Sequence, residues 1–75
     1  MMLKLDLRGL RCPLPVLRTK KAMKPMPENS VLRVITSDPG SVSDFKAYCD
    51  ATGNKLLENS ERGGVFYFSI QKSGN

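Results

Sequence analysis

One cysteine in this sequence is flanked by residues that could make it reactive. Cys12 follows Arg11 and precedes Pro13-Leu14-Pro15. Proline is tolerated in the first turn of a helix because the N–H groups there have no intrahelical acceptor, so we expect a helix to open at this point. A helix N-terminus and a neighbouring cation both favour a thiolate, and we therefore predict that the pKa of Cys12 lies below about 8.5, the value of a free cysteine.

Missing residue types narrow the chemistry that Cys12 can perform. The sequence has no histidine, and its other cysteine, Cys49, is too distant in the chain to form a CxxC motif. These facts argue against a Cys-His nucleophile, a thiol-disulfide motif and a Cys/His zinc site, and we expect no metal or cofactor. An exposed cysteine without a general base suits sulfur transfer between soft atoms. The alternative is a small buried residue, which is the common fate of free cysteines and the one we expect for Cys49.

Positive charge is concentrated in the part of the chain that contains Cys12. The net charge is +5, and residues 1–33 hold eight basic residues against two acidic ones, whereas residues 34–75 hold four against five. A basic surface attracts acidic proteins or nucleic acids. The alternative is an ordinary lysine-rich surface in contact with water. We expect partner binding by the cations that follow Cys12, namely Arg18, Lys20, Lys21 and Lys24.

The periodicity of apolar residues predicts four strands and two helices. Leucines alternate with polar residues at 3–7, which indicates a half-buried strand, whereas apolar spacings of three and four after residues 16 and 42 indicate helices. The expected elements are a strand at 3–7, a helix that opens at 12–15 and ends at Pro25 and Pro27, a strand at 31–36, a helix over 42–52, and strands at 55–58 and 65–70.

This order, β-α-β-α-β-β, predicts the fold class. Two helices and four strands suit an α/β (α+β) two-layer sandwich, in which both helices cover one face of a mixed four-stranded sheet. Two right-handed βαβ crossovers would make the early strands parallel neighbours. The last two strands would form an antiparallel hairpin through a connection at 61–64. A length of 75 residues fits one domain, 1–75.

The apolar content of the sequence predicts neither a signal peptide nor a membrane span. The N-terminal residues contain no apolar run like that of a signal peptide, and no stretch is long enough to span a bilayer. We therefore expect a cytoplasmic protein with reduced thiols and no membrane partner. Residues 73–75 are expected to fray.

Two stretches of the sequence resemble a known family. The segment Leu5-Asp6-Leu7-Arg8-Gly9-Leu10-Arg11-Cys12-Pro13-Leu14-Pro15 is similar to the CPxP signature of the TusA family, also called SirA-like or YedF/YeeD-like. The segment Ser37-Asp38-Pro39-Gly40-Ser41-Val42, followed by Asp44-Phe45 and Cys49, resembles the second signature of that family. The order of elements agrees along the whole chain.

The resemblance implies that Cys12 carries sulfur as a persulfide. The donor would be a cysteine desulfurase or a rhodanese-like enzyme, and the sulfur would pass to an acceptor protein. By the same resemblance, Pro13 and Pro15 shape the helix start, Gly9 lets the chain turn, and Asp6 anchors the loop before Cys12; Asp6 could equally be a solvated carboxylate at a strand end.

The resemblance leaves the pathway open. Members devoted to tRNA thiolation often carry an acidic residue where this chain has Leu14. The sulfur could serve tRNA thiolation, with tRNA as an indirect partner. It could equally serve thiosulfate or sulfur metabolism, or cofactor biosynthesis.

Two other functions compete with sulfur carriage. In the first, the chain is a small regulatory or RNA/protein-binding module in which Cys12 accepts no sulfur. The aromatic residues left for base stacking, Tyr48 and Tyr67, do not interleave with the basic cluster, which gives the RNA version little support. In the second, Cys12 is a redox sensor that forms a sulfenic acid, but a buried Cys49 could not resolve it.

Overall fold

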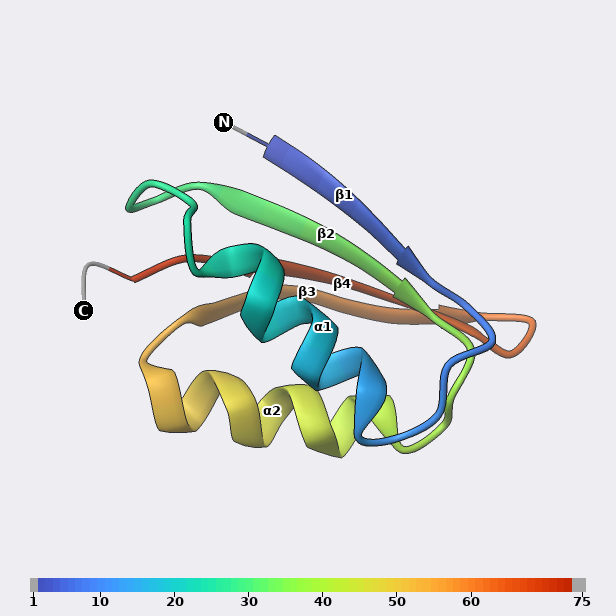
Figure 1. Ribbon diagram of the computed structural model, residues 1–75. Helices are drawn as coiled ribbons and strands as arrows, with labels where there is room; N and C mark the ends of the chain where they lie inside the picture. The colour runs from blue at the N-terminus through green and yellow to red at the C-terminus, as the bar shows by residue number, and fades with distance from the viewer. Residues whose placement is uncertain (1, 74–75) are drawn as a thin grey trace.

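The computed structural model describes residues 2–73, and its element order is the one expected from the sequence. The elements are β1 (Met2–Leu7), α1 (Leu14–Met23), β2 (Val31–Thr36), α2 (Ser41–Thr52), β3 (Lys55–Arg62) and β4 (Val65–Gln71). The strands form one mixed sheet and both helices cover the same face of it, so the predicted two-layer sandwich is confirmed (Figure 1). Among the described residues, no helix is long and apolar enough to cross a membrane.

The strand order, β1-β2-β4-β3, differs from the expected one in a single place. β1 and β2 are parallel neighbours as predicted, but β4 lies between β2 and β3 and is antiparallel to both. The expectation that the early strands would all be neighbours is therefore wrong for β3. The composition of the two strands gives the reason. β3 is mostly polar and exposed, which suits an edge, whereas β4 carries Phe68 and Ile70 into the core.

The hairpin between β3 and β4 is tighter than predicted. β3 continues to Arg62, and the turn consists of Gly63 and Gly64 alone, with φ angles of +59° and +84°. Two successive residues with positive φ are typical of a two-residue hairpin turn, and glycine adopts that conformation without strain. The Gly64 N–H donates to Glu61 Oε2 at 2.8 Å.

The core lies between the sheet and the two helices. α1 contributes Thr19 and Met23, and α2 contributes Phe45 and Cys49, which lie on the predicted apolar stripes. The ring of Phe45 packs on Phe68 of the sheet with centroids 4.6 Å apart. Cys49 is only 5% exposed, so its expected place in the core is confirmed.

The last described residue is held in place by two hydrogen bonds. Ser73 donates its N–H to Asn54 Oδ1 at 2.9 Å and its hydroxyl to the Thr52 carbonyl at 3.4 Å. The expected fraying is therefore wrong for Ser73, because the last residue of α2 and the loop that follows it bind the chain there. Gly74 and Asn75 lie outside the described residues.

The parallel pairing of β1 and β2 determines where a site can form. The register places Leu7 opposite Thr36, the last residues of the two strands. The loop that follows β1 and the loop that follows β2 therefore leave the sheet side by side, each leading into a helix (Figure 1). Crevices at the carboxyl ends of adjacent parallel strands are common binding sites in α/β proteins.

Candidate functional site

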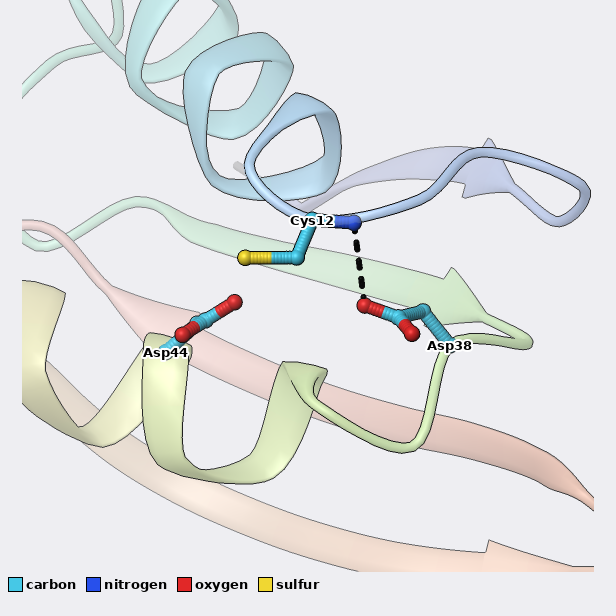
Figure 2. Close-up of side chains that lie close together, drawn as sticks. All are labelled: Cys12, Asp38 and Asp44. Carbon is cyan, nitrogen blue, oxygen red and sulfur yellow. Dashed lines mark hydrogen bonds between the residues drawn. The ribbon is translucent and has the colours of Figure 1, made fainter.

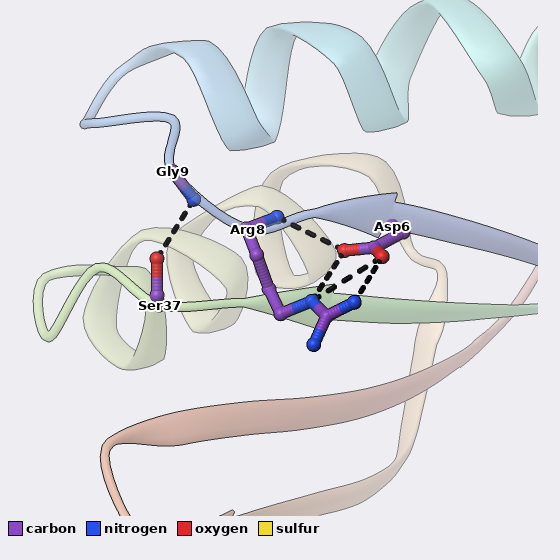
Figure 3. A network of polar contacts seen from close by, with 4 residues as sticks. All are labelled: Asp6, Arg8, Gly9 and Ser37. Carbon is purple, nitrogen blue, oxygen red and sulfur yellow. Dashed lines mark hydrogen bonds and ion pairs between the residues drawn. The ribbon is translucent and has the colours of Figure 1, made fainter.

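Two hydrogen bonds join the loop that carries Cys12 to the loop that follows β2. Gly9 donates its N–H to Ser37 Oγ at 2.8 Å, and Cys12 donates its N–H to Asp38 Oδ2 at 3.0 Å (Figures 2 and 3). Gly9 has a φ of +88°, a left-handed conformation that glycine adopts readily. These bonds fix the Cys12 backbone relative to the start of α2, although the partners lie 26 or more residues apart in the chain.

Cys12 is exposed and lies just before the first helix rather than inside its first turn. α1 begins at Leu14, Pro13 occupies the N-cap position, and the Cys12–Pro13 peptide bond is cis. Pro13 is exposed beside Cys12, whereas Pro15 is buried beneath the first turn of the helix. The CPxP segment thus places its cysteine at the surface and one of its two prolines in the core.

Two aspartates surround the Cys12 thiol. Figure 2 shows the sulfur pointing toward the carboxylate of Asp44, which comes from the first turn of α2, and the Asp38 carboxylate next to the Cys12 backbone nitrogen. The Cys12 sulfur and a carboxylate oxygen of each aspartate lie within 4.8 Å of one another. Both aspartates are half-buried, so water screens their charges less than at an open surface.

These carboxylates raise the pKa of the Cys12 thiol above its ordinary value. The largest cause is the Asp44 carboxylate, which can accept a hydrogen bond from the neutral thiol but not from the thiolate, followed by partial desolvation and by the negative charges of Asp44 and Asp38. Each of these favours the neutral thiol over the thiolate. The sequence-based prediction of a thiol more acidic than a free cysteine is therefore wrong.

The same prolines that mark the helix start explain this reversal. Pro13 and Pro15 have no N–H, the Cys12 N–H is bonded to Asp38, and the Leu14 N–H donates to the Arg11 carbonyl at 2.8 Å. No backbone N–H between residues 12 and 15 is left to stabilise a thiolate. Arg11 is exposed, and its charge is not among those that shift the pKa of Cys12.

Asp6 binds Arg8, which lies two positions later in the chain. Its carboxylate accepts the Arg8 N–H at 3.1 Å and pairs with the Arg8 guanidinium, with Arg8 Nη2 at 2.7 Å from Asp6 Oδ2 (Figure 3). These hydrogen bonds lower the pKa of Asp6 to about 2. Asp6 thus holds the chain just before Gly9 through a local contact with Arg8. The long-range hydrogen bonds to the Cys12 loop come instead from Ser37 and Asp38.

The four cations expected to bind a partner are all exposed on α1 or at its end, but they differ in how they lie relative to the cysteine. Lys20 lines a groove of about 390 Å³ together with Cys12, and Lys20 and Lys24 line a second hollow of about 380 Å³. Arg18 and Lys21 line neither of them. Of the four, Lys20 is therefore the one that shares a hollow with Cys12.

Asp38 and Asp44 are the site residues that the sequence analysis did not single out. The Ser37–Ser41 stretch offers several side chains that could cap a helix, but α2 has Gly40 at its N-cap and no side-chain cap bond. Asp38 directs its carboxylate to Cys12 instead. The available signal was the second family signature, which contains both aspartates, but only tertiary structure shows that it faces the first.

The cluster has few features of a metal site. Within residues 2–73, Cys12, Asp38 and Asp44 are the one group that places three potential metal-donor atoms within 4.8 Å of one another. One of these carboxylates already accepts the Cys12 N–H, and the sulfur is exposed. The arrangement is accounted for as an acidic environment that favours the neutral form of an accessible thiol.

Comparison with known proteins agrees with this geometry. Residues 3–72 match the family described as Sulfurtransferase TusA. The sulfur carrier protein TusA of Allochromatium vinosum is 55% identical over 69 residues, which cover 92% of this chain and 91% of that protein. A protein of Neisseria meningitidis serogroup A is 49% identical over 67 residues, which cover 89% of this chain and 90% of the relative.

A solved structure has the same fold. The crystal structure of a SirA-like protein from Desulfitobacterium hafniense superposes with a TM-score of 0.83 at 27% identity, and the match covers 96% of this chain and 99% of that one. The sequence match extends over nearly the whole chain and includes both loops of the site. The chain therefore belongs to the TusA sulfurtransferase family.

Proposed function

We propose that this chain is a sulfur carrier that accepts sulfane sulfur as a persulfide on Cys12 and passes it to an acceptor protein. The observation that carries the proposal is the position of Cys12. It is an exposed thiol in the CPxP motif of a TusA-family chain, whereas the other cysteine is buried. The relatives named as sulfur carriers support the same reading.

The proposed loading step exchanges one thiol for another. The Cys12 sulfur attacks the outer sulfur of a persulfide on the donor protein, and a new S–S bond forms on Cys12 as the S–S bond of the donor breaks. The inner sulfur of the donor leaves with the electron pair and takes up the proton that Cys12 gives up. The same exchange with a thiol of the acceptor unloads Cys12. No external oxidant or reductant is consumed, because the sulfane sulfur keeps its oxidation state.

The acidic surroundings of Cys12 favour the unloading half of this cycle. A persulfide is more acidic than a thiol, so a larger fraction of it is anionic at neutral pH. Asp38 and Asp44 repel that anion, whereas they accommodate a neutral thiol. The empty carrier is thus a stable resting state, and the loaded carrier is biased toward giving its sulfur away.

The donor is a cysteine desulfurase or a rhodanese-like protein, and the acceptor is a protein of a sulfur relay. The site has no deep pocket, so a partner must cover the exposed sulfur. The exposed cations of the α1 region, Arg18, Lys20, Lys21 and Lys24, would attract an acidic surface around the partner's cysteine. The relay would lie in the cytoplasm.

The test is the intact mass of the protein after incubation with a cysteine desulfurase and cysteine, or with a rhodanese and thiosulfate. Loading should add the mass of one sulfur atom, and a reductant should remove it. A later incubation with an acceptor thiol protein should return the carrier to its starting mass. A chain that gains no sulfur from either donor would instead be a binding module.

A further inference from the structure

Cys12 lies at one end of a groove that runs between the two helices. The hollow of about 390 Å³ beside Cys12 and the hollow of about 380 Å³ farther along α1 share two lining residues, Lys20 and Tyr48. The two hollows therefore adjoin at these residues, and together they are named the interhelical groove. Figure 1 shows α1 and α2 starting near each other at the site and separating toward their other ends.

The part of the groove next to Cys12 is apolar. Besides Cys12, Asp44 and the shared Lys20 and Tyr48, it is lined by the apolar residues Pro13, Val16, Leu17 and Ala47. Leu17 has 53% of its surface exposed, which leaves a large apolar side chain of α1 in contact with water. An apolar side chain bound here would remove Leu17 from water, which is the usual source of affinity at a docking surface.

The far part of the groove is basic and holds hydrogen-bond donors with poor acceptors. Lys20, Lys24 and Lys72 line it, and no acidic residue does. The Tyr48 hydroxyl donates only to Met23 Sδ, at 3.7 Å, and the Asn54 side-chain amide donates to the same sulfur at 3.9 Å and to the Tyr48 hydroxyl at 3.4 Å. A thioether is a weak acceptor, so the Tyr48 hydroxyl has no strong acceptor of its own. Lys72 Nζ already donates to two backbone carbonyls, at 2.8 and 2.7 Å, so a carboxylate entering this end would pair with the ammonium groups of Lys20 and Lys24.

We propose that the interhelical groove binds an extended, cysteine-bearing segment of the partner protein, with an apolar residue next to the cysteine and an acidic residue a few positions away. The segment's cysteine would meet Cys12, its apolar side chain would cover Leu17, and its carboxylate would lie among the lysines. This inference rests on the proposed function and adds to it the sequence pattern by which the partner is recognised.

The geometry of α1 gives the spacing within that segment. At about 1.5 Å per helical residue, Lys20 and Lys24 lie roughly 9 and 15 Å along the axis from the start of α1. An extended chain covers about 3.3 Å per residue, so the acidic residue should be about three to five positions from the cysteine. A folded acidic surface with no such segment would not enter the groove.

The test uses fluorescent peptides in which serine replaces the cysteine, so that binding is independent of sulfur chemistry. Each peptide has a leucine next to the serine and a glutamate four positions away, and both chain directions are made. Binding to the full protein is measured by anisotropy at low salt. We expect one direction to bind, and the Lys20→Glu/Lys24→Glu variant to bind it about tenfold more weakly.

A charge exchange separates groove binding from general attraction. A peptide with lysine in place of glutamate should bind the Lys20→Glu/Lys24→Glu variant better than it binds the native chain. Lys46→Glu is the matched control, because Lys46 is exposed on α2 and does not line the groove. Equal weakening by Lys46→Glu, no gain on charge exchange, or no binding in either direction would overturn the proposal. Failure of sulfur loading with intact peptide binding would count against the proposed function alone.

Discussion

The two cysteines of this chain have the same chemistry but opposite surroundings. Cys12 is exposed on a loop between two aspartates, whereas Cys49 is 5% exposed and packed between α2 and the sheet. Both thiols have a raised pKa, but burial is the largest cause at Cys49 and Asp44 is the largest cause at Cys12. Acidity therefore does not distinguish them. The difference that matters for sulfur transfer is access by a partner.

The largest effect should come from removing each sulfur in turn. Cys12→Ser should abolish sulfur loading by either donor, because a hydroxyl cannot form a persulfide, whereas Cys49→Ala should load like the native chain. The measurement is intact mass before and after reductant. Loading of Cys12→Ser would show that Cys49 becomes accessible and would remove the contrast between the two sites.

The free energy of unfolding should depend on Cys49 rather than on Cys12, the reverse of sulfur loading. Cys49→Ser places a hydroxyl in the core, and an unpaired buried hydroxyl costs about 1–3 kcal/mol of the free energy of unfolding. Cys12→Ser should leave the midpoint of urea unfolding unchanged, since the side chain is exposed. Urea denaturation followed by circular dichroism would compare the two variants. Equal destabilisation by both would mean that the Cys12 sulfur contributes to packing.

The acidic environment of Cys12 should be visible in its rate of alkylation. In the native chain the rate should rise with pH through a midpoint above the roughly 8.5 of a free cysteine. Asp44→Asn removes the hydrogen-bonded carboxylate and should lower that midpoint. Asp50→Asn is the matched control, because Asp50 lies on the same helix and acts on Cys49. A midpoint that stays the same in Asp44→Asn would show that desolvation, and not the Asp44 carboxylate, is the main cause of the raised pKa of Cys12.

The smallest effect should be a loss of stability at high pH. Burial raises the pKa of Cys49 to about 11, so the folded state keeps a proton that the unfolded state has already lost. The contribution of the Cys49 proton to the free energy of unfolding is fully present below about pH 9 and is lost as pH rises to about 11. Urea midpoints over this range should fall more steeply in the native chain than in Cys49→Ala. Parallel slopes would place the Cys49 thiol in contact with water.

The sequence was sufficient to predict the elements because local signals agreed with one another. Alternating leucines, the apolar stripe through Phe45 and Cys49, and the Gly63-Gly64 turn each act over a few residues. The placement of β4 between β2 and β3 depends on which strand buries more apolar surface, which no local pattern states. The hairpin was nevertheless identified, since its two strands are adjacent in the chain.

The site was only half predictable, for a related reason. Cys12 could be selected from its neighbours in the sequence, but Asp38 and Asp44 reach it only through the pairing of β1 with β2. The sign of the pKa shift depended on these aspartates. It also depended on the prolines, which mark a helix start and at the same time remove the N–H groups that would have stabilised a thiolate.

The direction of the strands also determines how this fold can be joined to other proteins. β1 runs toward the site and β4 runs away from it, so β1 starts and β4 ends at the end of the sheet that lies away from Cys12 (Figure 1). A fluorescent protein, an affinity tag or an enzyme fused before β1 or after β4 would be attached on the side away from the thiol. Such fusions should leave Cys12 open to partners, which makes the chain a convenient module for building artificial sulfur-transfer assemblies.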